Sequence, residues 1–83
     1  MNKGNCEINM FVSVVHNVNP ISKNRLKEEK VGKIIGMYDR FVILEIFNSD
    51  FEKDRIILGK KLYKESFRYS EIYPLKKPIE NIL

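Results

Sequence analysis

Positively charged side chains are interleaved with aromatic ones between residues 33 and 69, on segments with strand-like periodicity. Cations neutralise phosphate groups and exposed rings stack on unpaired bases, so a rigid sheet face of this composition suits nucleic acid. Rings at alternating positions also serve as core or cross-strand packing, and both uses stay open here. The candidate phosphate contacts are Lys33, Arg40, Lys60, Lys61, Lys64 and Arg68, with Tyr38, Phe41, Tyr63 and Tyr69 among them.

The sequence offers no constellation for catalysis or metal binding. It has one histidine, His16, and one cysteine, Cys6, whereas a structural zinc site takes four ligands. No nucleophile, phosphate-loop or paired-acid motif is found. The carboxylates Glu7, Glu45 and Glu65 are expected to form solvated cross-strand pairs. We therefore expect no enzymatic activity, no catalytic residues, no metal and no cofactor.

Length and composition predict one small soluble domain. The chain has 83 residues, 43% hydrophobic and 31% charged, and a net charge of +4. At this size burial contributes little net stability, so a homodimer is a reasonable expectation. No apolar run reaches the ~18 to 20 residues of a membrane span, and a lone cysteine fits a reducing compartment. The expected location is the cytoplasm.

The charge distribution is uneven along the chain. Residues 23–40 carry six basic and three acidic groups, residues 41–54 one and four, and residues 55–83 seven and three. Two basic stretches thus flank an acidic one, as in proteins with acidic partners. An abundance of Lys, Ile and Asn that reflects base composition explains the net charge equally well.

The hydrophobic pattern predicts short strands joined by turns. Residues 7–15 alternate, with Ile8, Met10, Val12 and Val14 on one face. Residues 30–38 contain Gly32 and Gly36, which favour a bulge or bend, and the pair at 39–40 predicts a tight hairpin to a strand at 41–47. On that strand the expected core residues are Val42, Leu44 and Ile46.

The remaining segments complete an all-β chain. A loop is expected at 16–24, around Asn19 and Pro20, and another at 48–54. A fourth strand spans 55–58 and 60–69, interrupted by Gly59, and Ser70 caps a helical turn at 70–73. Residues 1–6 and 74–83 are expected as tails. The prediction is a single domain, a small, strongly bent SH3-like barrel of four to five antiparallel strands.

Three strings of residues, in this order, carry a resemblance to known proteins: KNRL at 23–26, VGKIIGMYDRFVILEIF at 31–47 and YKESFRYSEIY at 63–73. Together they resemble the Veg family of small proteins from Gram-positive bacteria. The resemblance implies an SH3-like barrel without enzymatic activity, associated with control of gene expression, and carries over no catalytic residues. Two departures are the missing helical segment before the first strand and the longer spacing after KNRL. A shortened relative encoded by a phage or mobile element fits them.

Two functions follow as hypotheses. The first is a regulatory protein that associates with nucleic acid through the basic residues named above, assisted by a basic arm at Lys23, Arg25, Lys27 and Lys30, where Glu28 and Glu29 favour a solvated linker instead. The alternative is a module that binds a host or regulatory protein through a sheet edge or an apolar patch. Its candidate residues are Phe47, Phe51 and Tyr73.

Overall fold

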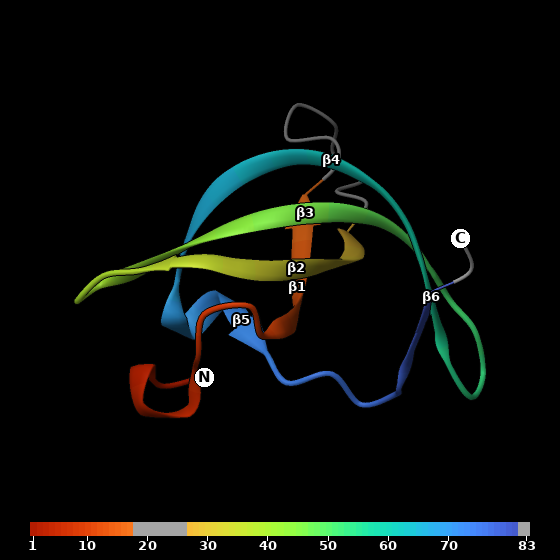
Figure 1. Ribbon diagram of the computed structural model, residues 1–83, viewed down its shortest axis with the longest axis horizontal. Coiled ribbons are helices and arrows are strands. Elements are labelled where there is room, and N and C mark those ends of the chain that lie inside the picture. The colour runs from red at the N-terminus through yellow and green to blue at the C-terminus, as the bar shows by residue number, and fades with distance from the viewer. Residues whose placement is uncertain (18–26, 82–83) are drawn as a thin grey trace.

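The structure is a computed structural model that describes residues 1–17 and 27–81. Of the loop expected at 16–24, residues 16–17 are strand instead, and residues 18–24 lie outside the described residues, as do the basic-arm residues Lys23 and Arg25 and the KNRL string. Within them the chain is all-β, as predicted, and its strands form one strongly curled sheet (Figure 1). The sheet is a half-barrel compatible with the SH3-like type. The described part contains no helix with the length and apolar character to traverse a bilayer.

The strands are β1 (Phe11–Asn17), β2 (Lys27–Met37), β3 (Phe41–Phe51), β4 (Ile56–Arg68), β5 (Ile72–Tyr73) and β6 (Ile79–Asn81). They form one sheet with the order β5-β1-β2-β3-β4-β6, antiparallel throughout except for the parallel pair β4 and β6. This differs from the four to five antiparallel strands expected, because the described chain adds a parallel one. A 3-10 turn, η1 (Lys3–Asn5), precedes the strands, and a second, η2 (Tyr69–Glu71), connects β4 to β5. The helical turn expected at 70–73 with Ser70 as its cap is therefore wrong in its bounds, since the N-cap is Arg68 and residues 72–73 are strand.

Strand β3 forms the centre of the sheet because its alternation places branched aliphatic side chains on one face. The predicted core residues Val42, Leu44 and Ile46 are each fully buried. The hairpin that precedes them is also confirmed, with the Tyr38 N–H donating to the Phe41 carbonyl at 2.9 Å. Neither residue between them has a positive φ, so the turn is not of type I′ or II′.

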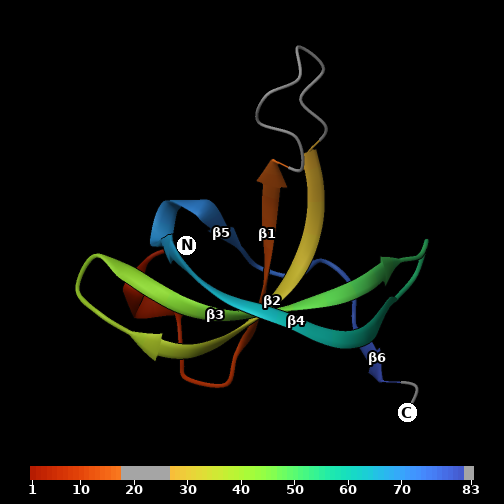
Figure 2. The same ribbon diagram turned by 90° about the horizontal axis from the view of Figure 1, so that it is seen from above.

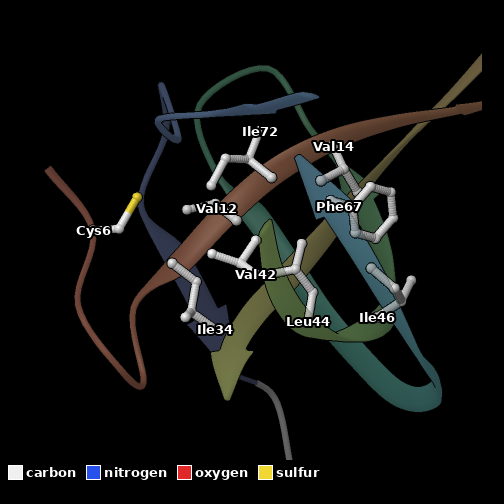
Figure 3. Close-up of a cluster of buried hydrophobic side chains, with 9 residues drawn as sticks. All are labelled: Cys6, Val12, Val14, Ile34, Val42, Leu44, Ile46, Phe67 and Ile72. Atoms are coloured by element: carbon white, nitrogen blue, oxygen red, sulfur yellow. The ribbon is translucent and has the colours of Figure 1, made fainter. Parts of the chain in front are cut away.

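The first core cluster fills the inside of the curled sheet and is closed by residues from both ends of the chain (Figure 3). Phe67 enters it from β4 and Ile72 from β5, which η2 carries across to the edge of β1. This crossover closes the half-barrel on the β1 side. The cluster consists of Cys6, Val12, Val14, Ile34, Val42, Leu44, Ile46, Phe67 and Ile72.

A second core cluster lies on the opposite face of the sheet. Val31, Ile56 and Leu58 are buried there, and Phe47 and Phe51 are half-buried against them. The segment after β5, which the sequence predicted as a tail, runs across the molecule to β6 (Figures 1 and 2). It packs Leu75 and Ile79 against the cluster.

The predicted loop at 48–54 is shorter than expected. Residues 49–51 pair with residues 56–58 and extend β3 to Phe51, since ladder hydrogen bonds outweigh the polar composition of the segment. The predicted interruption at Gly59 is a shift of register inside one continuous strand. A Cβ at Gly59 would lie 2.8 Å from the Asn48 carbonyl oxygen, which explains why glycine stands there.

The N-terminal segment is held to the barrel rather than loose. Cys6 is 7% exposed and its Sγ donates to the Asn2 carbonyl at 3.3 Å. The Met1 nitrogen donates to the carbonyls of Tyr69 and Ile72, both at 2.8 Å. Ile8, expected in the core, is 51% exposed, because the chain turns there and β1 begins only at Phe11.

Candidate nucleic-acid interface

The register of the sheet collects four of the six predicted cations on one face. Residues paired across antiparallel strands point to the same side, and Glu45 pairs with both Lys33 and Lys64, while Phe41 pairs with Arg68. Lys61 joins them through an ion pair to Glu45 at 3.1 Å. We name this side of β2–β4, opposite the first core cluster, the outer face.

Two irregularities in the pairing bring these residues together. A register shift between Ile34 and Gly36 places Tyr38 on the same side as Lys33, although strict alternation separates them. A second register shift, between Ile46 and Phe47 on β3, places Lys61 and Lys64 of β4 on one side of the sheet, although strict alternation would separate them. The composition of the outer face therefore depends on these bulges.

The other two predicted cations lie apart. Arg40 is exposed in the β2–β3 turn, at the rim of the outer face. Lys60 is exposed beside Gly59, in a stretch of β4 where the register changes, and no cross-strand partner assigns it to the face. The structure thus groups Lys33, Lys61, Lys64 and Arg68 on the outer face, with Arg40 at its edge, and leaves Lys60 outside the group.

Two of the acidic residues near the outer face, Glu45 and Asp39, are paired with cations. Glu45 lies between Lys33 and Lys64 and is bound by Lys61, with its side chain 17% exposed. In the turn, Lys3 Nζ donates to Asp39 Oδ1 at 2.9 Å. This hydrogen bond lowers the pKa of the Asp39 carboxyl and raises the pKa of Lys3. Lys64, Arg68 and Arg40 are exposed, and a third carboxylate, Glu71, accepts a hydrogen bond from the Arg68 backbone N–H at 2.8 Å.

The four candidate rings divide between the two sides of the sheet. Tyr38 and Phe41 stack on each other with centroids 4.8 Å apart and an angle of 16° between planes. Tyr38 is 53% exposed and Phe41 39%. Tyr63 pairs with Ile46 on the core side, where burial, followed by Glu65 and Glu28, raises the pKa of its phenol. Tyr69 packs against the first core cluster.

Of the alternative site residues, Phe47 lies on the outer face as the cross-strand neighbour of Lys61, whereas Phe51 and Tyr73 lie beside a groove. Phe47 is half-buried, with its ring 6.0 Å from that of Phe11. Phe51 and Tyr73 line two adjoining hollows of about 190 and 230 Å³, which share Glu29 and Lys76 in their walls. The sequence predicted these two rings but not the groove, because the groove forms where the segment after Tyr73 passes beside β1 and β2.

In the part of the chain that the structure describes, no three His, Cys, Asp or Glu side chains lie together so that they could hold a metal ion. Cys6 is buried, and burial raises the pKa of its thiol. Comparison of the chain with family models, with curated proteins and with solved structures finds no match.

Proposed function

We propose that this protein is a non-enzymatic, cytoplasmic regulatory protein that associates with nucleic acid through the outer face of β2–β4. The observation that carries the proposal is the grouping of Lys33, Lys64 and Arg68 on one open side, while Glu45 between them is bound by Lys61. Cations at fixed positions release counterions from a phosphate backbone without first having to be ordered.

The resemblance to the Veg family supports the regulatory part of the proposal. The two resembling strings that fall within the described residues, 31–47 and 63–73, build β2, β3, the end of β4 and β5. They therefore include every residue of the outer face named above except Lys61. Members of that family are associated with control of gene expression, and a nucleic-acid contact is a direct physical route to such control.

The test is binding measured by fluorescence anisotropy with labelled single-stranded DNA, RNA and duplex DNA at several salt concentrations. Four phosphate contacts, from Lys33, Arg40, Lys64 and Arg68, predict a slope of log K against log salt of about −3. Affinity is then expected to fall about 60-fold between about 50 and about 200 mM salt. Absence of binding at low salt, or a flat salt dependence, would contradict the proposal.

A matched pair of double variants separates site from net charge. Lys64→Gln with Arg68→Gln removes two cations from the outer face and is expected to reduce the salt slope by about 1.5. Lys53→Gln with Lys76→Gln removes the same charge from exposed positions elsewhere. Equal weakening by both pairs would mean that only the overall charge attracts the nucleic acid.

The groove beside Tyr73 favours a second candidate function, binding of a protein segment. Strand β1 continues to Asn17, whereas β5 pairs only with Ser13 and Val14. In residues 1–17 and 27–81, the edge of β1 from Val15 onward has no neighbour on the β5 side, and Val15 is 48% exposed. An extended peptide adds to such an edge through backbone hydrogen bonds.

This candidate is tested by affinity capture after nuclease treatment. The wild-type chain is expected to retain one protein at stoichiometric yield, and Val15→Asp is expected to lose it. The Lys64→Gln, Arg68→Gln variant is the control and should retain the partner. Equal capture by the wild type and by Val15→Asp would remove the groove as the binding site.

A further inference from the structure

We infer that Tyr38 and Phe41 form a platform on which an unpaired base stacks, so that the ligand of the outer face is single-stranded nucleic acid. The inference rests on the proposed function and narrows it to a class of ligand. The two rings are the described aromatic pair that is both stacked and exposed, and they lie at the end of the outer face that the second core cluster does not occupy.

The platform is held in place by the hairpin. The Tyr38 N–H donates to the Phe41 carbonyl at 2.9 Å, and the Tyr69 hydroxyl donates to the Tyr38 carbonyl at 2.6 Å. Gly36, two residues before Tyr38, leaves room for its ring: a Cβ there would lie 3.3 Å from Tyr38 Cε2. Because the rings are already ordered, a base that stacks on them loses little free energy to side-chain immobilisation.

Cations flank the platform where the phosphates of a bound strand would pass. Arg68 is the direct cross-strand neighbour of Phe41, and Arg40 lies in the same turn. Lys64 is four residues before Arg68 on β4, about 13 Å away along the strand. The acidic residue of the turn, Asp39, is already bound by Lys3 at 2.9 Å. The charge and the aromatic surface therefore match a flexible strand that offers phosphates and bases side by side.

The internal bases of a duplex cannot stack on this platform unless the duplex opens. Its bases are paired and stacked, and flipping one out requires a few kcal/mol. In a single strand every base presents an open face, and one aromatic stacking contact strengthens binding by about 5-fold to 150-fold. A single-stranded ligand is thus expected to bind more tightly than a duplex of the same length, in contrast to binding by charge alone.

The experiment measures anisotropy with fluorescein-labelled oligodeoxythymidine, a duplex of equal length and an abasic strand with the same phosphates. The wild type is expected to bind oligodeoxythymidine at least about 10-fold more tightly than either of the others. Tyr38→Leu should remove that preference and leave binding of the abasic strand unchanged, while Tyr38→Phe keeps it. Tyr73→Leu, which removes an exposed ring from another site, should also keep it.

Two results would overturn the inference, and they differ in whether the proposed function is also refuted. Equal affinity for all three probes, with Lys64→Gln and Arg68→Gln still weakening binding, would refute the platform and keep the proposed function. Absence of binding to every probe at low salt would refute both. Tyr38 is the substituted residue because it contributes to the hairpin through its backbone, which a substitution keeps, whereas Phe41 also pairs with Arg68 inside the sheet. Thermal unfolding checks that the variants remain folded.

Discussion

Adding one carbon atom at Gly32 tests how closely β2 packs on the first core cluster. A Cβ there would lie 2.8 Å from Leu44 Cδ1, 3.3 Å from Leu44 Cβ and 3.4 Å from Ile46 Cδ1. The first distance is well below the ~3.5 to 4.0 Å of a normal carbon contact. Leu44 and Ile46 are fully buried, so neither side chain has free space to move into.

The size of the effect follows from opposing terms. Overpacking a core destabilises a protein by about 1–3 kcal/mol, whereas replacing glycine restricts the unfolded chain and stabilises by about 0.4–1 kcal/mol. Gly32→Ala is therefore expected to lower the free energy of unfolding by about 1–2 kcal/mol. Leu44→Ala, which empties the space, is expected to lower it by about 2–5 kcal/mol.

The double variant distinguishes this reasoning from general damage to the sheet. Leu44→Ala removes the Cδ1 atom that Gly32→Ala would meet, so the two losses should sum to about 1 kcal/mol more than the loss in the double variant. Leu44→Val also lacks Cδ1 and serves as the partner if the alanine variant does not fold.

The assay is urea unfolding of the four proteins in the cycle, with thermal unfolding as a second measurement. Each kcal/mol corresponds to about 4–8 °C in Tm for a domain of this size. Gly4→Ala is the control, because a Cβ at Gly4 meets nothing within 4 Å. A coupling below about 0.3 kcal/mol between Gly32→Ala and Leu44→Ala would refute the packing argument.

Three further predictions concern the termini and the turn. Burial raises the pKa of the Cys6 thiol. The contribution of Cys6 to the free energy of unfolding is therefore complete below the pKa of an unfolded thiol, ~8.5, and is lost as pH rises through the folded pKa. Urea unfolding across this pH range should show the free energy of unfolding falling in the wild type, and this fall should be absent in Cys6→Ala. The hydrogen bond from Lys3 lowers the pKa of the Asp39 carboxyl. The contribution of Asp39 to the free energy of unfolding is therefore present above the unfolded pKa of ~3.9 and is lost as pH falls through the folded pKa. Carboxyl NMR titration should show that Lys3→Met returns the pKa of Asp39 to its ordinary range. Ile79→Ala should lower the free energy of unfolding by about 2 kcal/mol because Ile79 covers the second core cluster, whereas Ile8→Ala, at an exposed position, should change it by less than about 0.5 kcal/mol. An equal effect of the two isoleucine changes would mean that β6 contributes no packing.

The local hydrophobic pattern was sufficient to predict which residues of the central strand β3 are buried. The alternation of β3 predicted its buried face correctly, because this strand has neighbours on both sides and one face against the first core cluster. The two-residue hairpin and the irregularity near Gly36 were also predictable, since turn length and glycine act locally.

Elements that depend on distant pairing were not predictable in this way. β3 reaches Phe51 because residues 56–58 return beside it, and Cys6 is buried because η2 and β5 close over the N-terminal segment. Neither the length of β3 nor the burial of Cys6 can be predicted from the spacing of residues near them in the sequence. The division of the rings, with Tyr38 and Phe41 outside and Tyr63 on the core side, likewise follows from the register of pairing.

The sequence alone determined the class of fold, the principal strands and the residue types of the candidate site. The tertiary structure decided which of those residues share a face. A side-chain period of two assigns faces only until an extra residue enters the strand, and each bulge reverses the assignment beyond it. Two such reversals place Tyr38 with Lys33, and Lys61 with Lys64, and so assemble the outer face.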